Sequence, residues 1–188
     1  MLKFIEEFRR YTEIAGFKNV KIGNTKRFLL SFEEQKPSNV DVQFFDANRV
    51  ATWEHLYFAA LNALTAFETH KNISKSLPME TLLYAAAEKQ IVKATELMGI
   101  KSTSRSVAVL IMGKQLKTVR STLSLISKYF VQQPEDGVLE LSEDKMPLIQ
   151  RIFKIGSAEL QTVMQDCDKK KALTDLVIEM MALSTTKR

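Results

Sequence analysis

Apolar and polar positions alternate most regularly between Asp46 and Lys101, where they predict two successive amphipathic helices. In the first helix, apolar residues recur every three or four positions, so they share one helical face. These positions are Trp53, Leu56, Tyr57, Ala60, Leu61, Leu64 and Phe67. Thr52 is the expected N-cap, because its hydroxyl can accept a hydrogen bond from a free N–H group of the first turn.

The second helix is expected to run without interruption from Met79 to Met98. Its apolar stripe is formed by Met79, Leu82, Leu83, Ala86, Ala87, Ile91, Ala94, Leu97 and Met98. Pro78 is tolerated in a first helical turn, and Gly99 suits a left-handed helix end. The polar residues 71–78 then form the connection between the two helices.

The rest of the chain shows shorter patterns, some with the helical period of about 3.6 residues and some with the strand period of two. The expected strands span residues 13–22, 39–45, 106–112 and 138–141. The expected helices span residues 4–11, 25–35, 116–130, 158–165 and 172–183. Ser142, followed by two acidic residues, favours one more helix start. The sequence therefore predicts an α/β chain of the α+β type, with a small mixed or mainly antiparallel sheet covered by many helices.

Composition fits a globular protein. The chain has 188 residues, of which 45% are hydrophobic and 26% charged, so a single domain over residues 1–188 is expected. Cys167 is the only cysteine and has no partner for an internal disulfide. No run of about 18 apolar residues appears. These features predict a cytoplasmic protein in a reducing compartment, without a membrane partner.

The charge of the chain is concentrated in its middle. The net charge is +5, and residues 71–105 hold six basic against three acidic residues. Residues 114–130 hold four basic residues and no acidic one. A positive surface permits an acidic partner such as nucleic acid but does not require one.

No arrangement of residues indicates catalysis. His55 and His70 have no nearby ligands at metal-site spacing, and the six glycines never cluster into a phosphate-binding loop. Cys167 lies between Asp166 and Asp168, and negative neighbours raise the pKa of a thiol. We therefore expect no enzyme activity, no metal and no cofactor.

Binding residues are the remaining possibility, and two interpretations stay open for each segment. Residues 71–76 are either a plain linker, with Ile73 packed back into the core, or a nucleotide site with Ile73 against a base. In the second case Lys71 and Lys75 lie near phosphates, and Asn72 or Ser74 bonds to polar edges. The helix over 79–98 is either fully buried or docks a partner on one side.

Six short motifs stand in the order and spacing of one protein family. They are Phe45-Asp46-Ala47-Asn48-Arg49-Val50-Ala51, His55-Leu56, Asn72-Ile73-Ser74, Glu80-Thr81-Leu82-Leu83-Tyr84-Ala85, Gln90-Ile91 and Gly99-Ile100-Lys101. The chain resembles the small kinase-binding regulatory subunit of the KEOPS complex, the TPRKB family. The resemblance spans about residues 12–183, and residues 1–10 lie outside it.

The resemblance implies a non-catalytic subunit that serves threonylcarbamoyladenosine modification of tRNA. Such a subunit binds and stimulates the small atypical kinase/ATPase of KEOPS, recruits tRNA by its unpaired 3′ CCA end, and meets the catalytic threonylcarbamoyl transferase subunit through the kinase. The implied tRNA-binding residues are Lys71, Asn72, Ile73, Ser74, Lys75 and Lys89. The implied kinase-binding residues are Leu83, Ala87 and Ile91.

The chain departs from the family at Ala86-Ala87-Glu88, where a Ser-Gly pair and a basic residue are expected. This departure favours a straighter helix than in relatives. The alternative function is a protein-interaction module that regulates a kinase without contacting RNA.

Overall fold

The computed structural model describes residues 1–164 and 168–186, within which the chain forms two compact units. Unit 1 comprises Met1–Ala47 and Gly99–Val138, and unit 2 comprises Asn48–Met98 and Leu139–Arg188. Cys167 lies outside the described residues, so the interpretation of its surroundings stays a prediction. The expectation of a single domain also stays a prediction.

The described part of unit 1 is built on a four-stranded antiparallel sheet in the order β1-β2-β4-β3. The strands are β1 (Leu2–Ile5), β2 (Arg10–Phe17), β3 (Val40–Asp46) and β4 (Val107–Gly113). β4 pairs with β2 on one side and with β3 on the other. Because β4 has a strand on both sides and every one of its residues is buried, its continuous apolar sequence is explained.

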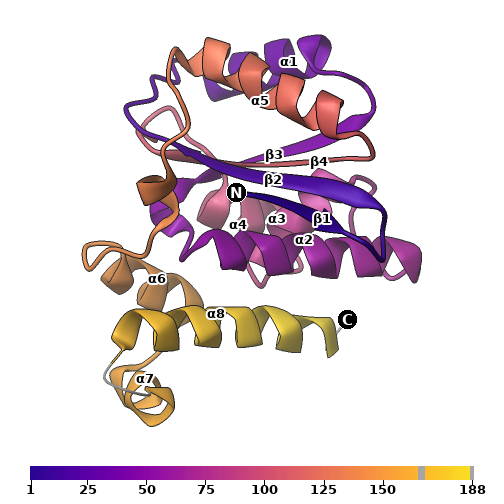
Figure 1. Cartoon of the computed structure of the whole chain (residues 1–188). Helices are drawn as coiled ribbons and strands as arrows, with labels where there is room; N and C mark the ends of the chain where they lie inside the picture. Colours follow the sequence, from indigo (N-terminus) through magenta and orange to yellow (C-terminus); the bar gives the residue numbers. More distant parts are fainter. Residues whose placement is uncertain (165–167, 187–188) are drawn as a thin grey trace. The chain divides into compact units, whose positions relative to one another are not determined.

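Helices α1 (Thr25–Gln35) and α5 (Leu116–Phe130) lie side by side over one face of this sheet (Figure 1). Asn24 caps α1, because its side-chain oxygen accepts from the Arg27 N–H at 2.9 Å. Aromatic rings fill the space beneath the two helices. The ring centroids of Phe32 and Phe44 lie 5.0 Å apart, and those of Phe28 and Phe130 lie 5.5 Å apart. The first of these contacts joins α1 to the sheet, and the second joins α1 to α5.

The expected helix over residues 4–11 is wrong, because this segment forms the β1–β2 hairpin. Phe4 and Tyr11 are directly opposite each other, with ring centroids 4.7 Å apart. In so short a segment, the same apolar residues fit the helical period and the strand period. The pairing of the two strands then satisfies the backbone hydrogen-bonding groups. The expected strand over 138–141 is also wrong, since Asp136–Leu139 forms the 3₁₀ helix η2.

Gly16 lies within β2, which pairs with β4 in regular register, and packing explains why this position has no side chain. A Cβ at this position would lie 2.5 Å from Cβ of Val138, which is closer than side-chain atoms approach. The strand therefore needs a glycine where the 3₁₀ helix η2 crosses it.

Unit 2 is helical in its described residues, with the 3₁₀ turn η1 (Ala47–Arg49) leading into it. Its helices are α2 (Trp53–Glu68), α3 (Leu77–Ala85), α4 (Ile91–Met98), α6 (Met146–Phe153), α7 (Ser157–Val163) and α8 (Lys169–Thr186). Ile149 and Phe153 of α6 pack with Leu173 and Val177 of α8 in one apolar core. The α+β fold with a small, mainly antiparallel sheet is thus confirmed.

One helix start differs from the prediction, and one predicted N-cap lacks its expected hydrogen bond. Helix α6 begins at Met146, because the carbonyl of Ser142 accepts from the N–H groups of Lys145 and Met146 in a preceding turn. Thr52 occupies the N-cap of α2, but its buried hydroxyl makes no hydrogen bond among the described residues. Across the described ranges, no helix has the length and apolar character needed to cross a bilayer.

Candidate functional site

The segment between α2 and α3 begins with a sharp turn at the end of α2. The N–H of Lys71 donates to the Ala66 carbonyl at 2.8 Å, and the N–H of His70 donates to the Phe67 carbonyl at 3.3 Å. His70 has a φ of 54°, in the left-handed region. This is a Schellman motif, which satisfies the last carbonyls of α2 and directs the chain away from the helix.

The 71–76 loop, defined as residues 71–76, is held by one buried carboxylate. Oε2 of Glu80 accepts from the N–H of Ile73 at 3.0 Å and from the N–H of Ser74 at 2.7 Å. Glu80 is completely buried in the first turn of α3. A charged acceptor makes stronger hydrogen bonds than a neutral one, and the N-terminal turn of a helix favours negative charge. Glu80 therefore fixes the backbone of the loop.

The polar side chains of the loop serve its own structure. The Asn72 amide donates to the Ser74 carbonyl at 2.9 Å, and the Ser74 hydroxyl accepts from the Ser76 N–H at 3.2 Å. Ser74 is only 5% exposed. These two residues shape the loop, and Ser74 does not present its hydroxyl to solvent.

The surface of the loop is formed by an apolar side chain between two cations. Ile73 is 45% exposed. It therefore does not pack back into the core, which is where the linker interpretation placed it. Lys71 and Lys75 on either side of it are exposed. An apolar surface flanked by ammonium groups suits an unpaired nucleotide, whose base is apolar on its faces and whose phosphates are negative.

The continuous helix expected from Met79 to Met98 is wrong, because α3 ends at Ala85 and α4 begins at Ile91. The N–H of Ala87 donates to the Tyr84 carbonyl at 2.8 Å, and the N–H of Glu88 donates to the Leu83 carbonyl at 3.0 Å. Ala87 has a φ of 49°. The helix break is therefore a second Schellman motif, with alanine at the position that glycine usually occupies.

A buried histidine contributes to ending α3 at this point. His55 Nε2 lies 2.8 Å from the Ala85 carbonyl, which a continuing helix would bond to residue 89 instead. His55 Nδ1 accepts from the Ala51 N–H at 3.2 Å, so the proton is on Nε2. Desolvation by complete burial lowers the pKa of His55 to about 4, so the imidazole is neutral at physiological pH.

The candidate kinase-binding residues differ in exposure. Leu83 is fully buried, Ala87 is half-buried, and Ile91 is 43% exposed. The neighbouring Val92 is 70% exposed, so α4 begins with an apolar surface that the prediction did not include. Arg49 donates to the carbonyls of Glu96 at 3.2 Å and Leu97 at 2.7 Å, which fixes the other end of α4.

The structure brings Ala87, Lys89 and Ile91 onto one short segment, away from the 71–76 loop. The loop precedes α3 and Lys89 follows it, and the nine residues of α3 are about 13 Å long. Lys89 is therefore separated from Lys71 and Lys75 by the length of a helix. Among the described residues, no group of three or more His, Cys, Asp or Glu side chains forms a potential metal site.

Comparison with known proteins assigns the chain to a family. A family model described as "Kinase binding protein CGI-121" matches residues 17–185. The chain belongs to the CGI-121 family. It is also similar to "Regulatory protein Cgi121" of Methanocaldococcus jannaschii, with 35% identity over 113 residues, or 60% of this chain and 70% of that protein.

These matches confirm the predicted resemblance to the KEOPS regulatory subunit of the Cgi121 and TPRKB type. The CGI-121 match contains the 71–76 loop, α3 and α4 in full. The chain is thus a member of a family described as kinase-binding, with a relative named as regulatory.

Sequence reasoning missed the roles of Glu80 and His55 in this CGI-121 family member. Both residues lie within the family motifs, but their hydrogen-bond partners do not adjoin them in sequence. Ile73 is seven residues from Glu80, and Ala85 is thirty residues from His55. The available signal was an ionisable residue at the start of an apolar helix and a histidine among apolar residues. Either pattern is common enough that only the structure identifies the partners.

Replacing Ala87 with glycine is expected to stabilise the protein by about 0.5–1 kcal/mol, because glycine adopts the left-handed region without the Cβ clash. Glycine at Ala86 is the matched control. Ala86 has a right-handed φ of −84°, so Ala86→Gly should lower the free energy of unfolding by about 0.5–1 kcal/mol. Urea unfolding of both variants measures the two signs, and destabilisation by Ala87→Gly would contradict the assigned turn.

Proposed function

We propose that this CGI-121 family protein is a non-catalytic KEOPS subunit that binds the small atypical kinase/ATPase and recruits tRNA by its unpaired 3′ CCA end. The observation that carries the RNA part is the 71–76 loop, where exposed Ile73 lies between exposed Lys71 and Lys75 on a backbone fixed by Glu80. Such a loop is a formed surface for a nucleotide rather than a flexible linker.

Each group in the loop has a distinct role in this proposal. The side chain of Ile73 contacts the face of an unpaired base, which gives attraction without sequence selectivity. The ammonium groups of Lys71 and Lys75 contact flanking phosphates and release counterions. Asn72 and Ser74 set the loop conformation, and Lys89 meets the RNA beyond the far end of α3.

Recruitment of tRNA supports threonylcarbamoyladenosine modification in the cytoplasm. RNA held at one end by this subunit has a raised effective concentration at the catalytic threonylcarbamoyl transferase subunit, which is reached through the kinase. The proposed subunit supplies binding energy and position, and its partners supply the chemistry.

The kinase surface in this proposal centres on the break between α3 and α4. Ile91 offers an exposed apolar side chain and Ala87 a close approach to the backbone, while Leu83 supports α3 from inside. Exposed Val92 extends the surface. These residues also favour the second candidate function, a module that binds and regulates a kinase without RNA contact.

Intact tRNA should bind the isolated protein more tightly than the same tRNA without its CCA end. Lys71→Glu together with Lys75→Glu should weaken binding of intact tRNA and reduce the slope of log K against log salt by about 1.4, as two fewer single-strand phosphates are contacted. Filter binding over a salt series measures both quantities. Lys169→Glu with Lys170→Glu, at two exposed positions of α8, is the control for net charge.

Three results would argue against the RNA site. Equal affinity for intact and trimmed tRNA would exclude recognition of the 3′ end. Equal losses of affinity in the double variant of the loop and the double variant of α8 would show that binding depends only on net charge. Absence of binding to either tRNA, with the kinase still bound, would favour the second candidate function.

A further inference from the structure

The exposed face of α5 is positively charged along its length. Its five exposed residues follow the helical period and so share one face: Lys117, Arg120, Ser121, Ser124 and Lys128. Three are cationic, two carry hydroxyls, and none is acidic or aromatic. We call this surface the α5 face. The 71–76 loop belongs to unit 2, whereas the α5 face belongs to unit 1.

The charges of the α5 face are not neutralised by neighbours. Among the described residues, no carboxylate forms an ion pair with Lys117, Arg120 or Lys128. The carboxylate of Glu135, which follows α5 in the chain, pairs with Lys18. Exposed cations without a local counter-charge attract anions from solution most strongly.

The neighbouring helix α1 has a different surface, which shows that the charge of the α5 face is not a general property of unit 1. Its exposed positions mix cations with Glu33, Glu34 and the apolar Leu30. Glu33 pairs with Lys36 at 3.0 Å. A mixed surface of this kind is the ordinary solvated face of a helix.

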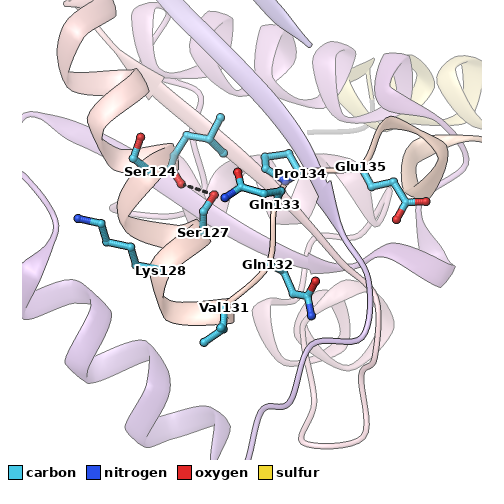
Figure 2. Close-up of a pocket in the computed structure, with 9 residues that line it drawn as sticks. Ser124, Ser127, Lys128, Val131, Gln132, Gln133, Pro134 and Glu135 are labelled. Atoms are coloured by element: carbon cyan, nitrogen blue, oxygen red, sulfur yellow. Dashed lines mark hydrogen bonds between the residues drawn. The ribbon is translucent and has the colours of Figure 1, made fainter.

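Neutral polar groups extend the α5 face at its C-terminal end. A hollow of about 1020 Å³ lies between α5 and residues 131–135. Figure 2 shows Gln133 beside Ser127 and Ser124, while the side chain of Gln132, one residue earlier in the segment, points away from them. The hydroxyl of Ser124 donates to the Arg120 carbonyl at 3.1 Å, so it stays close to the helix.

The backbone holds this extension in place. The N–H of Gln132 donates to the Ser127 carbonyl at 3.1 Å, and Val131 has a φ of 53°, which ends α5 in a Schellman motif. The N–H of Glu135 then donates to the Gly16 carbonyl at 2.8 Å. Bonds at both ends therefore fix the segment beside α5.

We propose that the α5 face binds the sugar–phosphate backbone of double-stranded RNA. Arginine, lysine, serine and glutamine are the side chains that contact phosphate and sugar oxygens. Lys117 and Lys128 are eleven residues apart, which along a helix is about 16 Å, enough to meet several phosphates. Without an exposed aromatic ring, the face offers backbone contact rather than stacking on bases. Duplex RNA is recognised mainly by such contacts.

This inference extends the proposed function. It rests on that function only because RNA is taken as the partner. A tRNA has paired arms as well as an unpaired end, and the two surfaces contact different parts of it. An assay with a duplex that has no unpaired 3′ end separates the α5 face from the 71–76 loop.

The test uses a blunt-ended RNA duplex and three double variants of the full chain. Lys117→Gln with Arg120→Gln should weaken duplex binding at least about tenfold and lower the salt slope by about 2. Lys169→Gln with Lys170→Gln removes the same charge elsewhere and should leave the slope within error. Lys71→Gln with Lys75→Gln should also leave duplex binding unchanged, even if it abolishes recognition of the CCA end. Thermal unfolding checks that each variant is folded.

Several outcomes would overturn the proposal. Wild-type protein that does not bind the duplex at low salt has no such surface. Equal losses from the α5 and α8 variants would assign binding to net charge. Binding of polyglutamate that depends on Lys117 and Arg120, without duplex binding, would assign the face to an acidic protein.

Discussion

Replacing Glu80 with alanine is expected to lower the free energy of unfolding by about 3–5 kcal/mol, because the buried N–H of Ser74 and the partly buried N–H of Ile73 lose a charged acceptor. The same change should release the 71–76 loop, since Ile73 and Ser74 are bonded to this carboxylate. On the proposed function, affinity for intact tRNA should fall towards that for tRNA without its CCA end. Urea unfolding measures the first effect and filter binding the second.

Glutamine at Glu80 is the matched control. Its amide oxygen keeps a neutral acceptor in the same place, and neutral hydrogen bonds have about half the strength of charge-assisted ones. Glu80→Gln should therefore show a smaller loss of stability than Glu80→Ala. Amide hydrogen exchange at Ile73 and Ser74 reports the loop directly, and unchanged protection in Glu80→Ala would contradict the role given to this carboxylate.

Acidification should destabilise the protein through His55. Its pKa is lowered from 6.5 to about 4 in the folded state. Between these values the unfolded chain binds a proton that the folded chain does not, so stability is complete above pH 6.5 and is lost as the pH falls towards 4. The pKa difference corresponds to about 3 kcal/mol.

The contribution of His55 is isolated by comparison with His55→Gln. Glutamine has no titration in this range, and every other titratable side chain is common to both proteins. The difference in unfolding free energy between the two proteins should therefore narrow by about 3 kcal/mol from pH 7 to pH 4. A constant difference across this range would show that His55 is accessible to protons in the folded state.

Elements with a long, uninterrupted pattern could be predicted from sequence. The helix over residues 25–35 matches α1 at both ends, and the continuous apolar run at 106–112 lies within one residue of β4. The secondary structure of both segments depends on which of their faces is buried, and the spacing of apolar residues indicates those faces. The helix over 116–130 was predicted for the same reason.

The errors occurred where distant residues decide the local structure. Ala86 and Ala87 have high helix propensity, so the sequence favours a continuous helix there. The break between α3 and α4 depends on His55, whose Nε2 hydrogen-bonds to the Ala85 carbonyl. These two residues are thirty positions apart in the chain. Gly99 was expected at a left-handed end, but no glycine in the described residues has a positive φ, and Gly99 pairs with Phe45 in a β-bridge.

The residues of the candidate site stay a prediction, and their geometry was not available from the sequence. The sequence singled out Ile73 and its lysines, because an apolar residue in a polar connection needs an explanation. It could not show that Glu80 reaches back to the loop, nor that Leu83 is buried while Val92 is exposed. Those facts follow from the way the chain turns at His70 and Ala87.

The loop held by Glu80 has a consequence for the rates of binding. Ordering the backbone of one residue costs about 1–2 kcal/mol of conformational entropy, and folding has already ordered Ile73 and Ser74. On the proposed function, an arriving RNA end meets a surface that does not rearrange. Variation of the exposed side chains should then change how long the RNA stays much more than how fast it arrives.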